Sequence, residues 1–235
     1  MQSVFVGFKR FNPIQSRVLP YALNNDGNML VCAPTSAGKT NVALLSILKA
    51  IADYRDPDSG IIDLSKFKVV YIAPMKALVA EITGNLSNRL KTLGITVKEL
   101  TGDVHLSKSQ IEETQIIIST PEKWDIITRK TGERLFVEKV KLIIIDEIHL
   151  LSDSRGPVLE SIIARTIRQV ETSQLPTRLV GLSATLPNYK DVGAVLRTKK
   201  EGLFYFDQSY RPIPLEQRYV GVTEKKGVRK MLMIN

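Results

Sequence analysis

The stretch from Ala33 to Thr40, which reads APTSAGKT, carries residue types that bind phosphate. An apolar run precedes it and a helical pattern follows it, which is the context that a phosphate-binding loop requires. Gly38 lets the backbone approach a phosphate, Lys39 supplies charge for the terminal phosphates, and the Thr40 hydroxyl suits Mg²⁺. The other loop residues expected to line a bound nucleotide are Pro34, Thr35, Ser36 and Ala37, and all of them except the proline can present a backbone N–H group.

Two carboxylates, Asp146 and Glu147, directly follow the apolar run 141–145. Ligands of open parallel sheets bind beyond the carboxyl ends of the strands, where these side chains would lie. We expect Asp146 to hold Mg²⁺, directly or through water, and Glu147 to orient and deprotonate an attacking water. With Lys39, they form the predicted catalytic set of a nucleotide site.

A third candidate, Gln15, lies in the first turn of a predicted helix. Asn12 is a favourable N-cap residue, and Pro13 suits the first helical position. A glutamine amide can pair with the N6 and N7 edge of adenine, so Gln15 is a candidate for adenine recognition. An exposed helix glutamine is the alternative, and the nearby phosphate loop favours the adenine contact.

Seven apolar runs predict the strands that position these residues, and helical patterns alternate with them. Because the strands are continuously apolar, they indicate an α/β fold in which helices cover both faces of a parallel sheet. The expected strands are 28–32, 68–73, 95–100, 115–119, 141–145, 178–182 and 203–206. Helices are expected over 13–23, 41–48 and 75–93, the last starting at Pro74, and from Pro121 and Gly156 onward.

The composition favours a polyanionic partner and a reducing compartment. The 235 residues carry a formal net charge of +9 and a pI near 9.6, which suits nucleic acid. A single cysteine, Cys32, excludes an internal disulfide. No run of eighteen apolar residues occurs, so no membrane partner is expected.

Several motifs together resemble those of the superfamily-two DExH helicases. APTSAGKT, DEIH and SAT occur in the family's order and spacing, and FNPIQS resembles its adenine-reading Q motif. APMKALVAE, TGD and STPEKWD resemble its nucleic-acid-gripping motifs, and longer stretches resemble the Ski-like branch. The resemblance covers nearly the whole chain. It implies a RecA-like P-loop NTPase fold, ATP and Mg²⁺ as cofactors, and ATP-dependent unwinding of RNA.

The resemblance also implies roles for residues outside the phosphate loop. His149 would relay the nucleotide state to Ser183 and Thr185. Helix starts after strands present N–H groups to phosphates, so such contacts would grip the RNA backbone without reading sequence. The residues implied for this grip are Pro74, Lys76, Thr101, Gly102, Thr120, Pro121 and Lys123. Lys123 fits an exposed helix lysine equally well, and His105 is expected on the surface.

Helicases of this class close two domains over one ATP. Residues 1–206 would then be the first RecA-like domain, and 207–235 a linker toward a second, absent domain in cis. Arg155, Arg165 and Arg168 are expected on a helix leading away from the site, so none is a finger for the transferred phosphate. We therefore expect this chain alone to bind ATP and hydrolyse it hardly at all.

The resemblance further implies RNA and spliceosomal small nuclear ribonucleoprotein proteins as partners, and a nuclear location. A helicase of the signal-cointegrator complex or a DNA-directed Ski-like helicase would share most of these motifs, because backbone grip is common to RNA and DNA. A nucleotide-gated RNA-binding scaffold is the alternative from another class. The intact Glu147 favours the motor, because a scaffold needs no base.

Overall fold

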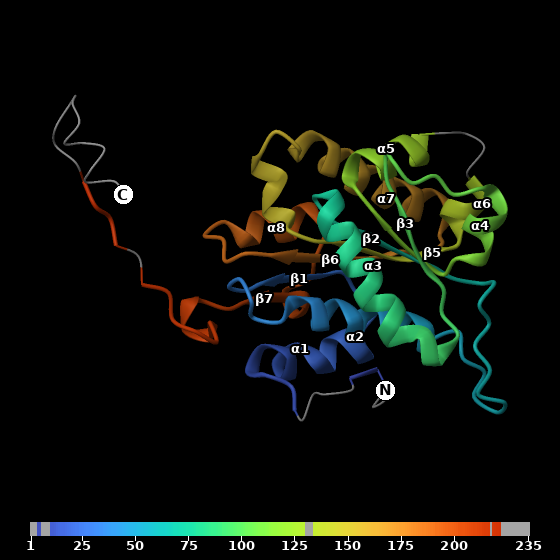
Figure 1. The fold of residues 1–235 in the computed structure, drawn as a ribbon, viewed down its shortest axis with the longest axis horizontal. Coiled ribbons are helices and arrows are strands. Elements are labelled where there is room, and N and C mark those ends of the chain that lie inside the picture. Colours follow the sequence, from blue (N-terminus) through green and yellow to red (C-terminus); the bar gives the residue numbers. More distant parts are fainter. Residues whose placement is uncertain (1–3, 6–9, 130–133, 217, 222–235) are drawn as a thin grey trace.

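Seven parallel strands form one sheet in the order β3-β4-β2-β5-β6-β1-β7 (Figure 1). The structure is a computed structural model that describes residues 4–5, 10–129, 134–216 and 218–221. All seven expected strands are present, and the expected α/β class is confirmed. The strands are β1 Met29–Cys32, β2 Lys68–Ile72, β3 Val97–Leu100, β4 Ile116–Ser119, β5 Val140–Ile145, β6 Arg178–Ser183 and β7 Leu203–Tyr205.

Each expected helix is present, with one corrected start, and three further short helices occur. The expected set is α1 Pro13–Asn24, α2 Lys39–Ala52, α3 Lys76–Leu90, α5 Pro121–Arg129 and α7 Gly156–Ser173. The short helices are α4 Lys108–Glu113, α6 Arg134–Glu138 and α8 Tyr189–Val195. Pro74 does not start α3, because Met75 is extended and acts as its N-cap. The expected end at residue 93 is also wrong for α3, because a 3₁₀ turn, Lys91–Leu93, follows Leu90.

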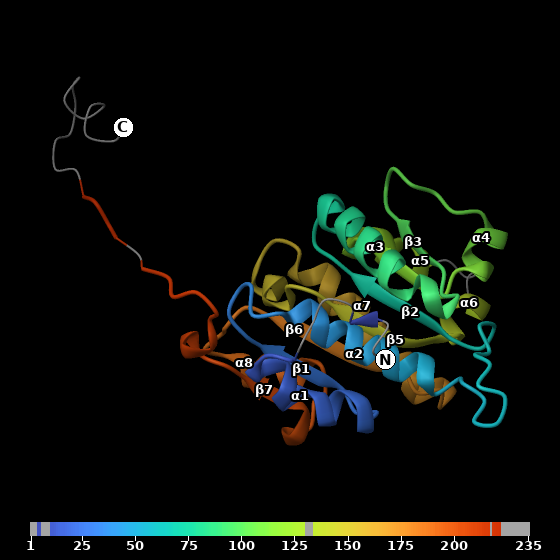
Figure 2. The same ribbon diagram turned by 60° about the horizontal axis from the view of Figure 1, so that its bottom comes forward.

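Helices cover both faces of the sheet, as Figures 1 and 2 show. Alternate strand residues point to opposite faces, so Val69 and Tyr71 enter the core under α1, α2 and α3. Val70 and Ile72 enter the second core, under α5, α7 and α8. Within the described ranges, no helix is long and apolar enough to span a membrane.

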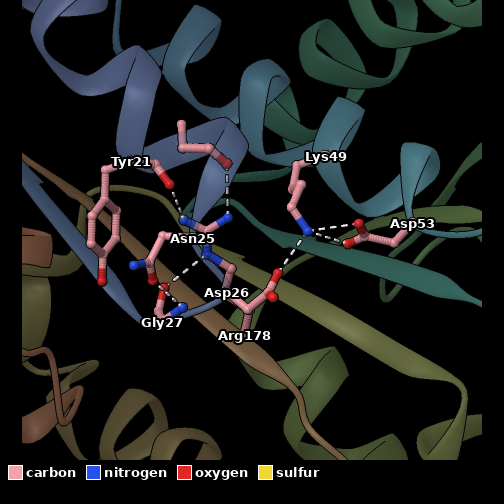
Figure 3. A network of polar contacts seen from close by, with 8 residues as sticks. Tyr21, Asn25, Asp26, Gly27, Lys49, Asp53 and Arg178 are labelled. Carbon is pink, nitrogen blue, oxygen red and sulfur yellow. Dashed lines mark hydrogen bonds and ion pairs between the residues drawn. The ribbon is translucent and has the colours of Figure 1, made fainter.

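A network at the amino-terminal ends of the strands ties α1 and α2 to the sheet (Figure 3). Arg178, the first residue of β6, donates from Nε to the Gly27 carbonyl at 2.9 Å and from Nη1 to the Ala22 carbonyl at 3.0 Å. Lys49 of α2 forms ion pairs with Asp26 at 2.7 Å and Asp53 at 2.6 Å. Because this network lies at the opposite edge from the predicted site, it leaves the carboxyl ends of the strands free for ligands.

The strand order divides the carboxyl edge of the sheet into two halves. β5, β6 and β1 are neighbours, and we call the edge at their ends the phosphate half. β3, β4 and β2 are neighbours. The residues implied for the grip on RNA follow these three strands, and we call the edge at their ends the track half. The two halves meet where β2 pairs with β5, with Ile72 beside Ile145.

The chain leaves the sheet after β7. Phe206 is buried and packs against Tyr210 with ring centroids 5.0 Å apart. The described residues of 211–221 extend away from the body of the molecule in both views (Figures 1 and 2). Residues 217 and 222–235 of the predicted linker lie outside the described residues.

Candidate nucleotide site and nucleic-acid track

The predicted phosphate loop joins β1 to α2 through a residue that must be glycine. Gly38 is the N-cap of α2 and has a φ of 83°, in the left-handed region. A Cβ at this position would also lie 2.4 Å from Gln15 Nε2. Thr35, Ser36 and Thr40 are exposed around the start of α2, and Pro34 and Ala37 are buried. The loop therefore presents its polar residues at a helix N-terminus, where anions bind.

Lys39 is held by the backbone of its own loop. Its side chain is 9% exposed, and Nζ donates to the carbonyls of Ala33 at 3.0 Å and Pro34 at 3.1 Å. Burial lowers the pKa of Lys39, and the carboxylates of Glu147 and Asp146 oppose that shift. An ammonium has three N–H donors, so one remains for a phosphate oxygen.

Asp146 is fixed at the boundary between the two halves of the edge. Its Oδ2 accepts from the Tyr71 hydroxyl at 2.7 Å, and its Oδ1 accepts from the Glu147 N–H at 3.0 Å. Burial raises the pKa of the Asp146 carboxyl, so ionisation is costly without a cation. Tyr71 was not predicted, because only the pairing of β2 with β5 brings its hydroxyl to this carboxylate.

These residues fit Mg²⁺ that arrives with a nucleotide. Within the described part of the chain, no group of three or more His, Cys, Asp and Glu side chains could hold a metal. Mg²⁺ commonly takes one or two protein ligands and completes its shell with phosphates and water. The Asp146 carboxylate and the exposed Thr40 hydroxyl are the candidate ligands, and they supply the oxygen donors that this ion requires.

The predicted coupling residues lie at the carboxyl ends of β5 and β6. His149 Nδ1 lies 3.3 Å from Glu147 Oε2 and accepts from the Ala184 N–H at 3.4 Å. The hydroxyl of Ser183 is buried beside the Cys32 thiol, and the Thr185 hydroxyl donates to the Phe206 carbonyl at 3.2 Å. The histidine thus lies between the predicted base and the backbone N–H of Ala184, and its Nδ1 can either accept from Ala184 or, when it carries a proton, donate to Glu147.

Gln15 braces the phosphate loop and is only 3% exposed. Its Oε1 accepts from the Asn12 N–H at 3.1 Å, and its Nε2 donates to the Gly38 carbonyl at 3.2 Å. Asn12, predicted only as a helix cap, also donates to the Ala37 carbonyl at 2.9 Å. The Gln15 amide retains one N–H and one lone pair, the number that the adenine edge requires.

The two lysines of the track half, of which Lys76 is exposed and Lys123 is half-buried, already have neighbours. Lys76 Nζ lies 2.6 Å from Asp103 Oδ2, and these side chains are 58% and 71% exposed. Lys123 Nζ lies 3.2 Å from Nδ1 of His105, which is exposed as expected. A phosphate that binds Lys76 would have to compete with the Asp103 carboxylate.

The other predicted track residues form the turns around these lysines. The turn at Thr101 is closed by two bonds to Val104, each 3.2 Å long, and leaves Gly102 exposed. Thr120 is largely buried and precedes Pro121, the first residue of α5. Pro74 is buried, and its carbonyl accepts from Arg155 Nη1.

Arg155 lies just ahead of α7, the helix that was expected to lead away from the nucleotide site. Arg155 is the N-cap of α7 and lies across the strand ends, where it contacts Pro74. The sequence pattern indicated where α7 begins, but it carried no information that β5 lies next to β2. Arg165 pairs instead with Asp125 of α5, and Arg168 is exposed on α7.

Comparisons with known proteins identify the family of this chain. Residues 12–192 match the DEAD/DEAH box helicase family. The chain is 59% identical over 236 residues to the U5 small nuclear ribonucleoprotein 200 kDa helicase of Drosophila melanogaster, covering 100% of this chain and 11% of that protein. It is 60% identical over 229 residues to the activating signal cointegrator 1 complex subunit 3-like protein of Dictyostelium discoideum, covering 97% of this chain and 10% of that protein.

A solved structure supports the fold. The DUF1998 helicase MrfA bound to DNA and AMPPNP superposes with a TM-score of 0.67 at 21% identity, over 86% of this chain and 27% of that chain. At this identity the similarity shows the RecA-like fold alone. The family match extends from the Asn12 cap into α8 and includes both halves of the sheet edge. The chain belongs to the DEAD/DEAH box helicase family.

Proposed function

We propose that this chain is the ATP-binding domain of an ATP-dependent RNA helicase. The observation that carries the proposal is that Lys39, which follows β1, lies within electrostatic reach of Asp146 and Glu147, which follow β5. β6 separates these strands in the sheet, so only the fold brings the three charges together. Residues 1–206 would be the first RecA-like domain, and 207–235 a linker to a second domain in cis.

The chain's own groups account for binding and for activation of water. The free N–H of Lys39 and the exposed start of α2 would hold the terminal phosphates, and Gln15 would bind adenine. Mg²⁺, held by Thr40 and Asp146, would neutralise charge on these phosphates when bound. Glu147 would take a proton from the attacking water, and its contact with His149 would report that state to β6.

RNA is the proposed substrate of the track half. The two lysines of this half, its helix starts and the net charge of +9 suit a phosphate backbone. One close relative is named for a small nuclear ribonucleoprotein, so we propose unwinding of paired U4/U6 RNA in the nucleus, with spliceosomal proteins as partners. The relative of similar identity named for a signal cointegrator complex supplies the competing assignment.

Glu147→Gln tests this proposal in a longer helicase, by which we mean this chain together with the proposed second domain. The change removes the base but keeps the shape of the site, so ADP affinity should stay within twofold while turnover falls by about 10² to 10⁴. Glu160→Gln, an exposed change on α7, is the matched control and should leave both unchanged. Turnover at the parent rate would contradict the role of Glu147.

Strand displacement on a U4/U6 duplex tests the finer assignment. The parent helicase should unwind this duplex with ATP, and Glu147→Gln should not. A DNA duplex of the same sequence is the comparison substrate. Unwinding of DNA alone would contradict the RNA assignment.

A further inference from the structure

Arg155 crosses the boundary between the two halves of the sheet edge. Its Nη1 donates to the carbonyl of Pro74, which follows β2. Its Nε lies 3.5 Å from Oε1 of Glu122, in the first turn of α5 beyond β4. One guanidinium therefore joins the segment that leads into α3 to the first turn of α5, and both of these helix starts belong to the proposed RNA track.

The position of Arg155 follows that of the acidic pair. The 3₁₀ helix η4, Ile148–Ser152, directly follows Glu147 and leads to the start of α7. A Cβ at Gly156 would lie 2.1 Å from the Leu151 carbonyl oxygen, so glycine permits α7 to begin directly against η4. The Gly156 N–H also donates to the Asp153 carbonyl at 2.9 Å. A movement of the Glu147 turn would therefore move the guanidinium.

A second connection shows what Arg155 adds. The Asp146 N–H donates to the Ile72 carbonyl at 2.9 Å, which fixes β5 against β2 up to the last residue of each strand. On the other side of β2, the Ala73 N–H donates to the Ser119 carbonyl at 3.0 Å, so a backbone hydrogen bond also joins the segments that lead into α3 and α5. Arg155 extends the connection to these segments. The Arg155 and Glu122 side chains are 39% and 48% exposed, and such exposed ion pairs contribute little to stability.

We propose that Arg155 is a positioning residue that holds the two RNA-gripping helix starts in register with the Glu147 turn. This inference rests on the proposed function, and it adds a specific route by which RNA engagement reaches the base. RNA on the track would hold the segments at Pro74 and Glu122 in place. Arg155 would then hold η4 and Glu147 in their productive position. Its loss should weaken coupling to RNA without weakening ATP binding.

The test compares Arg155→Gln, Arg155→Lys and Glu122→Gln in the longer helicase, with Arg168→Gln as control. Arg168 is an exposed arginine on the same helix and loses the same charge. For Arg155→Gln, we expect the RNA concentration that half-saturates ATPase stimulation to rise about tenfold, the effect of one charge-assisted hydrogen bond. The KM for ATP and the melting temperature should match those of the control. Arg155→Lys should show a smaller rise in the half-saturating RNA concentration than Arg155→Gln, because an ammonium keeps the charge but lacks the fork of donors that a guanidinium has.

The outcomes separate this inference from the proposed function. If RNA does not stimulate the parent helicase, the proposed function fails. If RNA stimulates the parent and Arg155→Gln has the parent's half-saturating RNA concentration, the inference fails alone. A parallel rise in KM for ATP with a lower melting temperature would show a merely structural arginine and would also overturn it. If Arg155→Gln does not fold, Glu122→Gln decides the question by the same measurements. For that variant we expect a smaller rise in the half-saturating RNA concentration.

Discussion

The phosphate half and the track half of one sheet edge hold their charges in opposite ways. In the phosphate half, Lys39 is buried against backbone carbonyls, and Asp146 is fixed by Tyr71 and by the following N–H. In the track half, Lys76 and Lys123 are paired with exposed neighbours. The first half is organised before its ligand arrives, whereas the second must exchange protein partners for ligand phosphates.

The difference matches what each half would bind. A nucleotide has one fixed distribution of charge, and buried groups interact strongly because water screens them little. A nucleic-acid backbone repeats its charge along a strand, and exposed lysines follow it at little cost in desolvation. Substitutions in the phosphate half should therefore change affinity strongly and independently of salt, whereas those in the track half should have small, salt-dependent effects.

The largest effect is expected for Lys39→Ala. The phosphates lose a buried, charge-assisted donor, so ADP affinity with Mg²⁺ should fall by about 100-fold or beyond detection by calorimetry. Lys66→Ala, an exposed change at the opposite edge of the sheet, should not alter it. Unchanged ADP affinity in Lys39→Ala would contradict the assignment of residues 33–40 as a phosphate-binding loop.

Asp146→Asn is expected to stabilise the folded protein when no nucleotide is bound. Burial raises the pKa of this carboxyl above its unfolded value despite the neighbouring Lys39, so between the two values the folded state binds more protons than the unfolded state. Stability is therefore lost as the pH rises through the folded pKa, and the full cost is present above it. Asp146→Asn should raise the melting temperature at pH 7, and the gain should shrink as the pH falls toward about 4.

The same variant should bind ADP no better when Mg²⁺ is added, because it lacks the metal ligand. Melting curves at several pH values and calorimetry with and without Mg²⁺ measure the two effects. A lower melting temperature at pH 7 would contradict the view that burial of this carboxylate is costly.

The smallest effect is expected for Asp103→Asn in the track half. Removing the carboxylate frees Lys76, so affinity for single-stranded RNA should rise up to about fivefold at low salt, the range of an exposed ion pair. The gain should disappear near 1 M salt, where the screening length is about 3 Å. Asp58→Asn, an exposed change in the loop after α2, is the control for net charge. Weaker RNA binding by Asp103→Asn, measured by fluorescence anisotropy, would contradict the view that Asp103 competes with RNA phosphates for Lys76.

Sequence and structure agree most where burial dictates the pattern. The strands could be predicted because both faces of the sheet are covered, which makes β1 apolar throughout and β2 mostly apolar after Lys68. Gly38 could be predicted because a phosphate loop restricts which residue fits there. The short helices α4 and α8 could not, because few of their residues are buried and no apolar stripe repeats.

Contacts between the halves could not be predicted either. The hydrogen bond from Tyr71 to Asp146 and the reach of Arg155 to Pro74 both require β2 to lie beside β5. Strand order is decided by the crossovers, and no residue pattern within a strand encodes it. The pairing of Lys76 with Asp103 is similar, since the end of β3 comes near the start of α3 only through the intervening β4.

Steady-state phosphate release tests the central claim most directly, measured on this chain and on the longer helicase, each with and without single-stranded RNA. The phosphate half supplies a loop, a candidate metal ligand and a candidate base. Arg155 contacts Pro74 and Glu122, and Arg165 pairs with Asp125, so we expect neither of them, nor the exposed Arg168, to act as a finger. We expect this chain to bind ADP but to release phosphate about 10³ to 10⁵ times more slowly than the RNA-stimulated helicase, with no response to RNA. Rapid, RNA-stimulated release by this chain alone would contradict the two-domain account.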